Sequence, residues 1–409
     1  MKTVLLITMY YPPCNHTASK RPACFAKYLE NYGWQPLVLC RQWTKDNCIY
    51  DPEFMTNINE QVFIREIPGD DNGSRSFLTP FKKAHTLFFP HHAPHILRKN
   101  ALQALPDIFS RYPIDAIWAT CPSDLPLYLA AMSSRQWKVP WVADFRDVWD
   151  QPYMGPRVLV PSHLFHEKRL LKSASAVVTV SEGLADILRA RYRRTIHIFP
   201  NGFDPADLAP MGACSLSKFN IVYTGNLIFP QRDPRPVLDA LGLLIGSGEI
   251  SEEDVVMEFY GVREDLLSSH FSGHKYYHLV NCTQRLPRME CIKRQRSSAV
   301  LLQLAHAGEK GIMTGKMFDY LAARRPILAV PNDGDCIDQF LRKTNAGMSC
   351  STAEDIAAQL RKWYREWKAT GTVVYQGTEE AIMKYSCKEQ ANQLAKLLDG
   401  VIRKRMSNA

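Results

Sequence analysis

The stretch Lys2-Thr3-Val4-Leu5-Leu6-Ile7-Thr8 begins the chain with a continuous apolar run, and the residues that follow it decide the fold class. Residues 21–31 carry apolar side chains at helical spacing, Gly33 ends this helix, and residues 36–40 form the next apolar run. Strands that are apolar on both faces and alternate with helices are typical of a parallel sheet covered by helices on both sides. The stretch therefore predicts an α/β fold.

The same alternation continues along the chain and restarts once. Residues 200–212 interrupt it with three prolines and two glycines, which marks a linker. We therefore expect two doubly wound, Rossmann-like domains, residues 1–205 and 213–386, that face each other across a cleft. The expected strands are 4–8, 36–40, 114–119, 141–145, 176–180, 196–199, 219–224, 255–260, 299–304 and 327–330; the expected helices include 125–134, 183–191, 234–245 and 316–323.

The composition excludes several classes of protein. Of 409 residues, 46% are hydrophobic and 22% charged, as in folded proteins, and the net charge is +9. The sequence contains no run of about 18 apolar residues, so it predicts no membrane-spanning helix. The start of the chain lacks a small-residue cleavage site and reads as a strand rather than a signal peptide. Eleven cysteines without a Cys-x-x-Cys pair favour free thiols in the cytosol.

Residues 74–99 do not follow the alternation of strands and helices. They mix phenylalanines and leucines with lysines, arginines and histidines. One interpretation is a locally packed loop and helix. The other is a basic and aromatic contact with a membrane surface or a lipid-linked substrate.

The loop after the first strand is the first candidate site, because ligands of doubly wound sheets bind beyond the carboxyl ends of the strands. Its small residues allow a substrate to approach the backbone, and the helix that follows offers free N–H groups. An ordinary turn explains the same residues. The candidate binding residues are Asn15, His16, Ala18, Ser19 and Arg21.

Charged residues follow the strand 141–145 directly. Asp144, Arg146 and Asp147 are costly at the end of a buried strand unless they are paired or used. Arg146 pairs with one of the acids in the structural interpretation. In the functional interpretation, all three line the cleft and position substrate hydroxyls.

The loop after the strand 219–224 contains a glycine and an arginine. Gly225 and Asn226 allow close approach of a ligand to the backbone, and Arg232 can bond two oxygens of a diphosphate. The full glycine pattern of a phosphate-binding loop is absent, so this signal alone is weak.

The segment 308–323 is the strongest candidate. The small-residue stretch before its helix makes an anion site at the helix N-terminus, and Lys316 adds a positive charge. Asp319 can accept hydrogen bonds from a ribose. An intrahelical pair of Lys316 with Asp319, worth about 0.3–0.5 kcal/mol, is the structural alternative. The other candidate residues of the segment are Gly311, Ile312, Thr314 and Gly315.

Two possible metal sites are weaker. Asp333-Gly334-Asp335 follows Pro331-Asn332 and reads as a turn, and the histidines at 91, 92 and 95 lack a regularly spaced fourth ligand. We therefore expect no metal ion.

These motifs, taken in order, resemble the GT-B glycosyltransferases of family 4 found in bacterial polysaccharide clusters. The resemblance covers nearly the whole chain, and two motifs depart from the family. Residues 15–19 replace a glycine pair, and the family's two-glutamate motif has Asp319 as its second acid and Gly311 at the place of its first. The motifs that carry the resemblance are Tyr10-Tyr11-Pro12-Pro13, Ala18-Ser19, Arg21-Pro22, Trp141 to Asp147, Pro200-Asn201-Gly202, Tyr223-Thr224-Gly225 and Lys316 to Ala323.

The resemblance implies a retaining, metal-independent transfer of a sugar from a nucleotide-diphosphate donor to a hydroxyl acceptor in polysaccharide or glycoconjugate biosynthesis. It implies no cofactor other than this co-substrate. The acceptor, a saccharide, lipid-linked or small molecule, would bind the first domain at residues 15–21, and the donor would bind the second. The helix 387–404 would pack back on the first domain. The protein would be cytoplasmic, or peripheral at the inner face of the membrane.

The implied chemistry assigns roles to the candidate residues. Arg232 and Lys316 would stabilise the charge that develops on the departing diphosphate, and Asp144, Arg146 and Asp147 would position hydroxyls. No carboxylate pair suited to a double displacement is evident, which favours a same-face route.

Three other functions fit part of the sequence. A sugar-nucleotide 2-epimerase has the same fold but needs no acceptor. A nucleic-acid-binding protein would explain the positive charge, yet the basic residues are dispersed and carry no recognition motif. A catalytically inactive scaffold would explain the two departures from the family pattern.

Overall fold

The computed structural model describes residues 1–46, 48–55, 63–68, 95–149, 160–208, 216–306 and 313–407. The chain divides into two compact units. The first combines Met1–Asn201 with Cys387–Ala409, and the second is Gly202–Ser386. The division falls inside the proline- and glycine-rich stretch 200–212.

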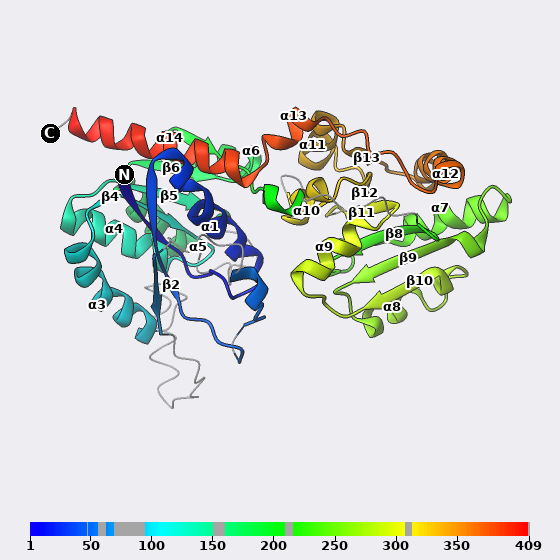
Figure 1. Ribbon diagram of the computed structural model, residues 1–409, viewed down its shortest axis with the longest axis horizontal. Helices are drawn as coiled ribbons and strands as arrows, with labels where there is room; N and C mark the ends of the chain where they lie inside the picture. The colour runs from blue at the N-terminus through cyan, green and yellow to red at the C-terminus, as the bar shows by residue number, and fades with distance from the viewer. Residues whose placement is uncertain are drawn as a thin grey trace. The chain divides into compact units, whose positions relative to one another are not determined.

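The first unit is built on a seven-stranded sheet in the order β3-β2-β1-β4-β5-β6-β7, in which each neighbouring pair of strands is parallel (Figure 1). Both faces of the sheet are buried: Leu5 and Ile7 of β1 join one apolar core, and Val4 and Leu6 join the other. The strands are β1 (Lys2–Ile7), β2 (Trp34–Arg41), β3 (Phe63–Ile67), β4 (Ile114–Thr120), β5 (Trp141–Phe145), β6 (Ala176–Thr179) and β7 (Ile196–Ile198).

Helices cover both faces of this sheet. Apolar residues of α3, α4, α5 and α6 share a core with one face, and those of α1 and α14 share a core with the other. The helices are α1 (Thr17–Tyr28), α3 (His95–Arg111), α4 (Leu125–Trp137), α5 (Val160–Leu171), α6 (Glu182–Tyr192) and α14 (Cys387–Met406), with short 3-10 turns at η1 (Leu29–Tyr32) and η2 (Pro52–Met55).

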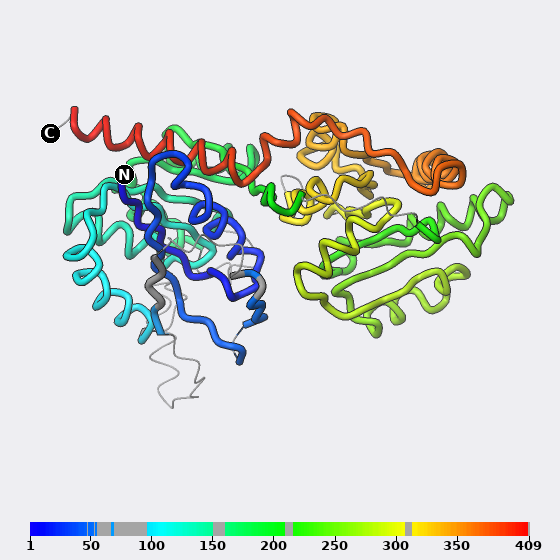
Figure 2. The backbone as a smooth tube through the Cα atoms, in the orientation of Figure 1, coloured from blue at the N-terminus to red at the C-terminus, as the bar shows by residue number. Residues whose placement is uncertain are grey.

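The end of the chain belongs to the first unit. Leu394 and Leu398 of α14 are fully buried, and in Figure 2 this red helix runs beside the blue N-terminal elements. A disulfide joins Cys24 of α1 to Cys387, with their Cα atoms 5.4 Å apart. The expectation of free thiols throughout is therefore wrong for these two cysteines, which the packing of α1 on α14 brings together.

The second unit repeats the architecture with a six-stranded sheet in the order β10-β9-β8-β11-β12-β13. Tyr223 of β8 points into one apolar core and its neighbour Val222 into the other, so both faces are buried again. The strands are β8 (Phe219–Thr224), β9 (Val255–Tyr260), β10 (Val280–Thr283), β11 (Val300–Leu304), β12 (Ile327–Val330) and β13 (Gly347–Ser349).

Its helices also lie on both faces. Those on one face are α7, α8 and α12, and those on the other are α10, α11 and α13 (Figure 1). The helices are α7 (Arg235–Gly246), α8 (Glu264–Phe271), α9 (Arg288–Arg296), α10 (Lys316–Ala323), α11 (Cys336–Thr344), α12 (Ala353–Thr370) and α13 (Glu379–Met383), with 3-10 turns at η5 (Pro205–Leu208), η6 (Glu252–Asp254) and η7 (Tyr277–Leu279).

Each sheet has a point at which the order of the strands reverses. In the second unit the chain starts at β8, adds β9 and β10 on one side, and returns to β8's other side with β11. The loops after β8 and β11 therefore leave in opposite directions, which is where ligands bind in sheets of this kind. The corresponding point of the first sheet lies between β1 and β4.

Several of the predicted features fall partly or wholly outside the described residues. The candidate membrane contact 74–99 is described only from His95, where α3 begins, and Gly311 and Ile312 are not described. Within the described ranges, none of the helices has the length and apolar character needed to cross a membrane.

Candidate functional site

The loop after β8 begins with a glycine that its conformation requires. Gly225 has φ +115°, a backbone conformation that L side chains rarely adopt, and its N–H donates to the carbonyl of Tyr260. A β-carbon at this position would lie 3.3 Å from Nζ of Lys316. The glycine thus brings bare backbone against the lysine at the start of α10.

Lys316 is buried at its charged end without a hydrogen bond. Its terminal nitrogen has no hydrogen-bond partner in the described part of the chain and lies 3.8 Å from the centre of the Tyr223 ring. Burial lowers the pKa of Lys316 well below its ordinary range, and the charge of Arg232 lowers it further. The alternative of an intrahelical pair with Asp319 is therefore not what the structure shows.

Arg232 lies in the same loop as Gly225, and its guanidinium lies near Tyr223 and Lys316. Its Nε donates to Nε2 of His306 at 2.9 Å, and its Nη1 donates to the carbonyl of Asn226 at 3.0 Å. The hydroxyl of Tyr223 donates to that same carbonyl at 2.7 Å. Burial raises the pKa of Tyr223 to about 12, although the nearby Arg232 opposes the shift. Tyr223 is thus the common neighbour of both cations.

A buried tyrosine fixes α10 to the sheet. The hydroxyl of Tyr320 accepts from the backbone N–H of Thr224 at 3.0 Å and donates to the carbonyl of Leu302 at 3.1 Å. These contacts join α10 to the end of β8 and to the middle of β11. Lys316, one turn earlier on the same helix, is held against Gly225 as a consequence.

Asp319 faces a second group of charges. It lies close enough to Asp207 and Arg288 to affect the pKa of both. Arg288 forms a buried ion pair with Asp207, which joins α9 to η5. Burial raises the pKa of Asp207, and Arg288 opposes this shift. Asp319 is half-buried and lies near the ion pair of Arg288 with Asp207.

The residues before α10 provide one more unsatisfied polar atom. Oγ1 of Thr314 is buried and has no hydrogen-bond partner among the described residues. Gly315 caps the helix, and its carbonyl accepts from Phe318. The predicted donor residues Gly225, Asn226, Arg232, Thr314, Gly315 and Lys316 therefore converge at one end of the second sheet.

This arrangement is suited to binding an anion. A helix N-terminus, a guanidinium and an ammonium lie together at a point where the backbone is bare. An ammonium that is buried without a counter-charge is unfavourable, and a bound anion would remove that cost. An oxygen-rich, doubly charged group such as a diphosphate fits these donors.

The residues predicted in the first unit are used differently. Asp144 is fully buried and binds Arg21 through two hydrogen bonds of 2.9 Å each, while Thr120 donates to it at 2.8 Å. Arg21 also donates to the carbonyls of Phe199 and Pro200. Asp144, predicted to be catalytic, and Arg21, predicted to bind the acceptor, form a buried ion pair that ties α1 to β5.

Most of the other predicted acceptor residues in the first loop are also buried or hydrogen-bonded within the protein. Asn15 is buried and donates to Asp51 at 2.9 Å, and Ser19 is buried. His16 is exposed, caps α1 by accepting from Ala18 and stacks on Tyr10 at 4.3 Å between ring centres. Of the five predicted acceptor residues, His16 is thus the one that offers an exposed side chain.

Arg146 joins the loop after β4 to the start of α1, at the reversal point of the first sheet. Its Nε donates to the carbonyl of Cys121 at 2.6 Å and its Nη1 to that of Ala18 at 2.9 Å. Its Nη2 is buried without a hydrogen-bond partner in the part of the chain described here. Burial lowers the pKa of Arg146, with Asp144 opposing the shift. Asp147 lies half-buried beside it.

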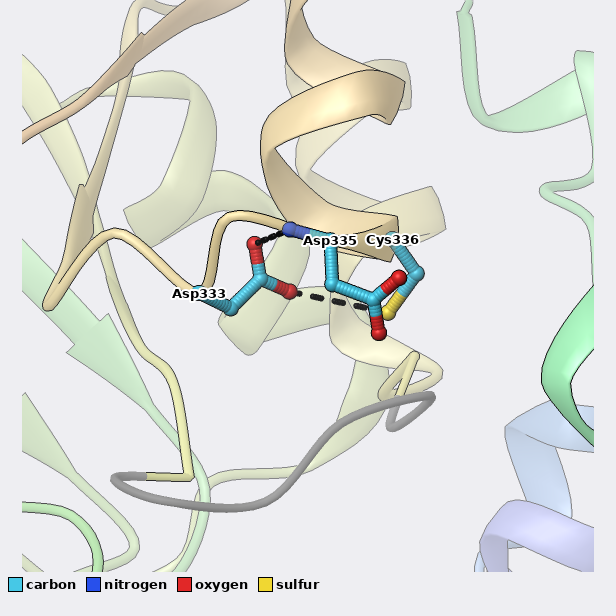
Figure 3. Close-up of side chains that lie close together, drawn as sticks. All are labelled: Asp333, Asp335 and Cys336. Carbon is cyan, nitrogen blue, oxygen red and sulfur yellow. Dashed lines mark hydrogen bonds between the residues drawn. The ribbon is translucent and has the colours of Figure 1, made fainter.

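The Asp333-Gly334-Asp335 motif forms the turn expected from its sequence. The side chain of Asp333 accepts from the backbone nitrogens of Asp335, Ile337 and Asp338 at 2.9–3.0 Å, and so caps α11. Figure 3 shows this carboxylate turned toward Asp335 and Cys336, whose ligand atoms lie within 4.8 Å of one another. The backbone contacts explain the position of Asp333 without an ion.

Sequence reasoning gave no role to three members of the second-domain site. Tyr223 and Tyr320 belong to the motifs that carry the family resemblance, and each hydroxyl makes an ordered hydrogen bond. His306 follows β11 as a single polar residue with no motif around it. The signal that could have found it is its position, because it lies two residues after the end of a strand beside the reversal point.

The comparisons with known proteins agree with this fold. Residues 25–202 match the family described as glycosyl transferase 4-like domain. No curated protein matches the chain by sequence. The crystal structure of Anabaena Alr3699/HepE in complex with UDP and glucose is similar, with 14% identity over 98% of this chain and 100% of that chain and a TM-score of 0.63.

Two further solved structures share the fold. A glycosyltransferase from Rickettsia africae ESF-5 has a TM-score of 0.67 and 12% identity over 98% of each chain. A putative UDP-N-acetylglucosamine 2-epimerase from Listeria monocytogenes has a TM-score of 0.58 and 10% identity over 100% of this chain and 98% of that chain. The predicted two-domain α/β fold of GT-B type is confirmed, and the match of residues 25–202 bears out the family 4-like resemblance for that part of the chain.

Replacing Gly225 tests the close approach of backbone to Lys316. We expect Gly225→Ala to destabilise the protein by about 1–2 kcal/mol, because alanine is strained at this φ and its methyl group presses on the lysine. Gly248→Ala is the matched control, since Gly248 has φ +72° with open space around its β-carbon site. Urea unfolding of both variants measures the difference. Equal losses at the two positions would contradict the contact.

Proposed function

We propose that this family 4-like glycosyltransferase moves a sugar from a nucleoside-diphosphate donor to a hydroxyl acceptor with retention at the anomeric carbon and without a metal ion. The observation that carries the proposal is the pair of cations, Lys316 and Arg232, at the reversal point of the second sheet. They are the charges that a departing diphosphate requires. Gly225 leaves room for it beside the backbone.

The chemistry follows from where charge develops. As the bond between the sugar and the diphosphate lengthens, negative charge grows on the leaving oxygen and positive charge on the sugar ring. Fixed cations that face the leaving oxygen lower the barrier, because they stabilise the transition state more than the ground state. Lys316 and Arg232 would do this without a bound ion. The N-terminus of α10 would add backbone dipoles of the same sign.

A same-face reaction accounts for retention. In this route the departing phosphate oxygen takes the proton of the acceptor hydroxyl while that hydroxyl attacks the sugar carbon from the same side. No protein carboxylate is needed as a nucleophile, which agrees with the burial of Asp144 in an ion pair. Arg146, whose Nη2 is unsatisfied, is the residue of the first domain best suited to contact a substrate oxygen.

The donor is proposed to be a UDP-sugar, held at its ribose by Asp319. The similar Anabaena protein was crystallised with UDP and with UDP-glucose. A thermal-shift panel of UDP-, GDP- and ADP-sugars identifies the base, since a ligand that binds the folded state raises its melting temperature. The acceptor is proposed to be a saccharide or lipid-linked hydroxyl of glycoconjugate biosynthesis.

A same-fold 2-epimerase is the second candidate, because one similar structure is that of a putative UDP-N-acetylglucosamine 2-epimerase. The two activities differ in their products. A transferase releases UDP in proportion to the acceptor supplied and forms a new glycoside. An epimerase converts its substrate with no acceptor present.

Removing either cation is expected to impair donor use without unfolding the protein. We predict that Lys316→Ala and Arg232→Ala each lower kcat/KM for the donor by about 100-fold or more, because each removes a charge that faces the leaving group. Arg235→Ala is the control, since Arg235 is exposed and pairs with Asp233 in the same loop. Steady-state kinetics and far-UV circular dichroism measure activity and folding. Unchanged rates in both cation variants would remove the diphosphate assignment.

The affinity for UDP is expected to fall at alkaline pH. Burial lowers the pKa of Lys316, so in the free protein this lysine loses its proton at a lower pH than an ordinary lysine does. Because the diphosphate binds the protonated form, affinity falls as the pH rises through that lowered pKa. Calorimetry between pH 7 and 9.5 measures the effect. Lys316→Arg keeps its charge over this range, and the same slope in that variant would contradict the assignment.

Chelation is expected to leave activity intact. Asp333 is occupied by backbone N–H groups, so EDTA should not change the transfer rate, and Asp333→Ala should act on stability, by about 1 kcal/mol, through the lost helix cap. Transfer assays with and without EDTA, followed by added manganese, test this. Loss of activity that manganese restores would instead assign Asp333 and Asp335 to a metal.

A further inference from the structure

His306 makes a contact with Arg232 that neither the family pattern nor the proposed chemistry assigns. Arg232 lies in the loop after β8, and His306 lies two residues after the end of β11, 74 positions along the chain. Their bond therefore crosses the reversal point of the second sheet. It joins the two loops between which the proposed diphosphate site lies.

The bond fixes how the guanidinium is turned. A guanidinium has five N–H groups in one plane. Nε donates to His306 and one N–H of Nη1 donates to the carbonyl of Asn226. In the part of the chain that the structure describes, Tyr223 is a further neighbour of this guanidinium. The edge formed by Nη1 and Nη2 is the one that binds two oxygens of a phosphate at once.

The two anchors of Arg232 lie on opposite sides of the reversal point. Asn226 belongs to the same loop as Arg232, and its carbonyl also accepts from the hydroxyl of Tyr223 in β8. His306 follows Ala305, whose N–H donates to the carbonyl of Val330 at 2.8 Å, and Ala305 itself is buried. His306 thus ties Arg232 to the β11 side of the sheet, while Asn226 ties it to the β8 side, and the two contacts together set the orientation of the guanidinium relative to Lys316.

We propose that His306 is a positioning residue for Arg232: its Nε2 accepts the Nε–H of Arg232 and turns the guanidinium edge toward the diphosphate of the donor. This inference rests on the proposed function. His306 acts through Arg232 and need not touch the donor. The acceptor nitrogen must be unprotonated, so the ring proton of this histidine lies on Nδ1.

A double-mutant cycle with UDP as the ligand tests the inference. Calorimetry compares the wild type, His306→Leu, Arg232→Ala and the double variant. We expect His306→Leu to weaken UDP binding about tenfold, as loss of a hydrogen bond to a charged group does, and to have no further effect when Arg232 is already absent. An equal effect of His306→Leu in both backgrounds, or no effect in either, would overturn the proposal.

A conservative variant separates positioning from folding. His306→Gln places an acceptor oxygen near the position of Nε2, so we expect it to bind UDP within about twofold of the wild type. A variant that unfolds or binds as weakly as His306→Leu would count against the proposal. If His306→Leu itself does not fold, His306→Ala takes its place in the cycle.

The same measurements distinguish this inference from the proposed function. If Arg232→Ala binds UDP as tightly as the wild type, the diphosphate assignment fails and the positioning role fails with it. If Arg232→Ala weakens binding while His306→Leu does not, the diphosphate assignment stands and only the role of His306 is overturned.

Discussion

The site of the second domain depends on the side-chain nitrogen of Lys316, which is buried and has no hydrogen-bond partner within the described ranges of the chain. A charge in this position is unfavourable, and its pKa falls accordingly. The surrounding residues nevertheless hold it there: Gly225 removes the side chain that would displace it, Tyr223 places a ring beneath it, and Tyr320 fixes its helix to the sheet. Such an arrangement favours the binding of an anion. The loops after β8 and β11 separate at this end of the parallel sheet, which leaves space for the anion there.

The two domains use the corresponding place in different ways. In the first domain, Arg21 and Asp144 form a buried ion pair that joins α1 to β5. Each charge is neutralised by the other, and the pair contributes to the stability of the fold. Breaking such a buried pair from one side leaves an uncompensated charge, which makes both residues structurally essential. In the second, Lys316 and Arg232 have the same sign and cannot neutralise each other. The uncompensated positive charge therefore lies in the second domain, where we propose that the donor binds.

Much of the fold could be predicted from the sequence, because the central strands are continuous apolar runs. The bounds of β5, β8, β9, β12 and α10 agree with those expected. The edge strands β3, β10 and β13 were missed, since Val280–Thr283 and Gly347–Ser349 are short and partly polar and give no periodic signal. In the site, residue type and position after a strand identified Gly225, Arg232 and Lys316. The pairing of Arg21 with Asp144, 123 positions apart, and that of Arg232 with His306 are tertiary contacts that a single sequence does not encode locally.

A crystal structure of the protein with UDP would show where the diphosphate binds. We expect its oxygens to lie within hydrogen-bond distance, about 2.7–3.2 Å, of Nζ of Lys316 and of the outer edge of the Arg232 guanidinium. A diphosphate bound elsewhere in the second domain, with Lys316 still buried and unpartnered, would contradict it.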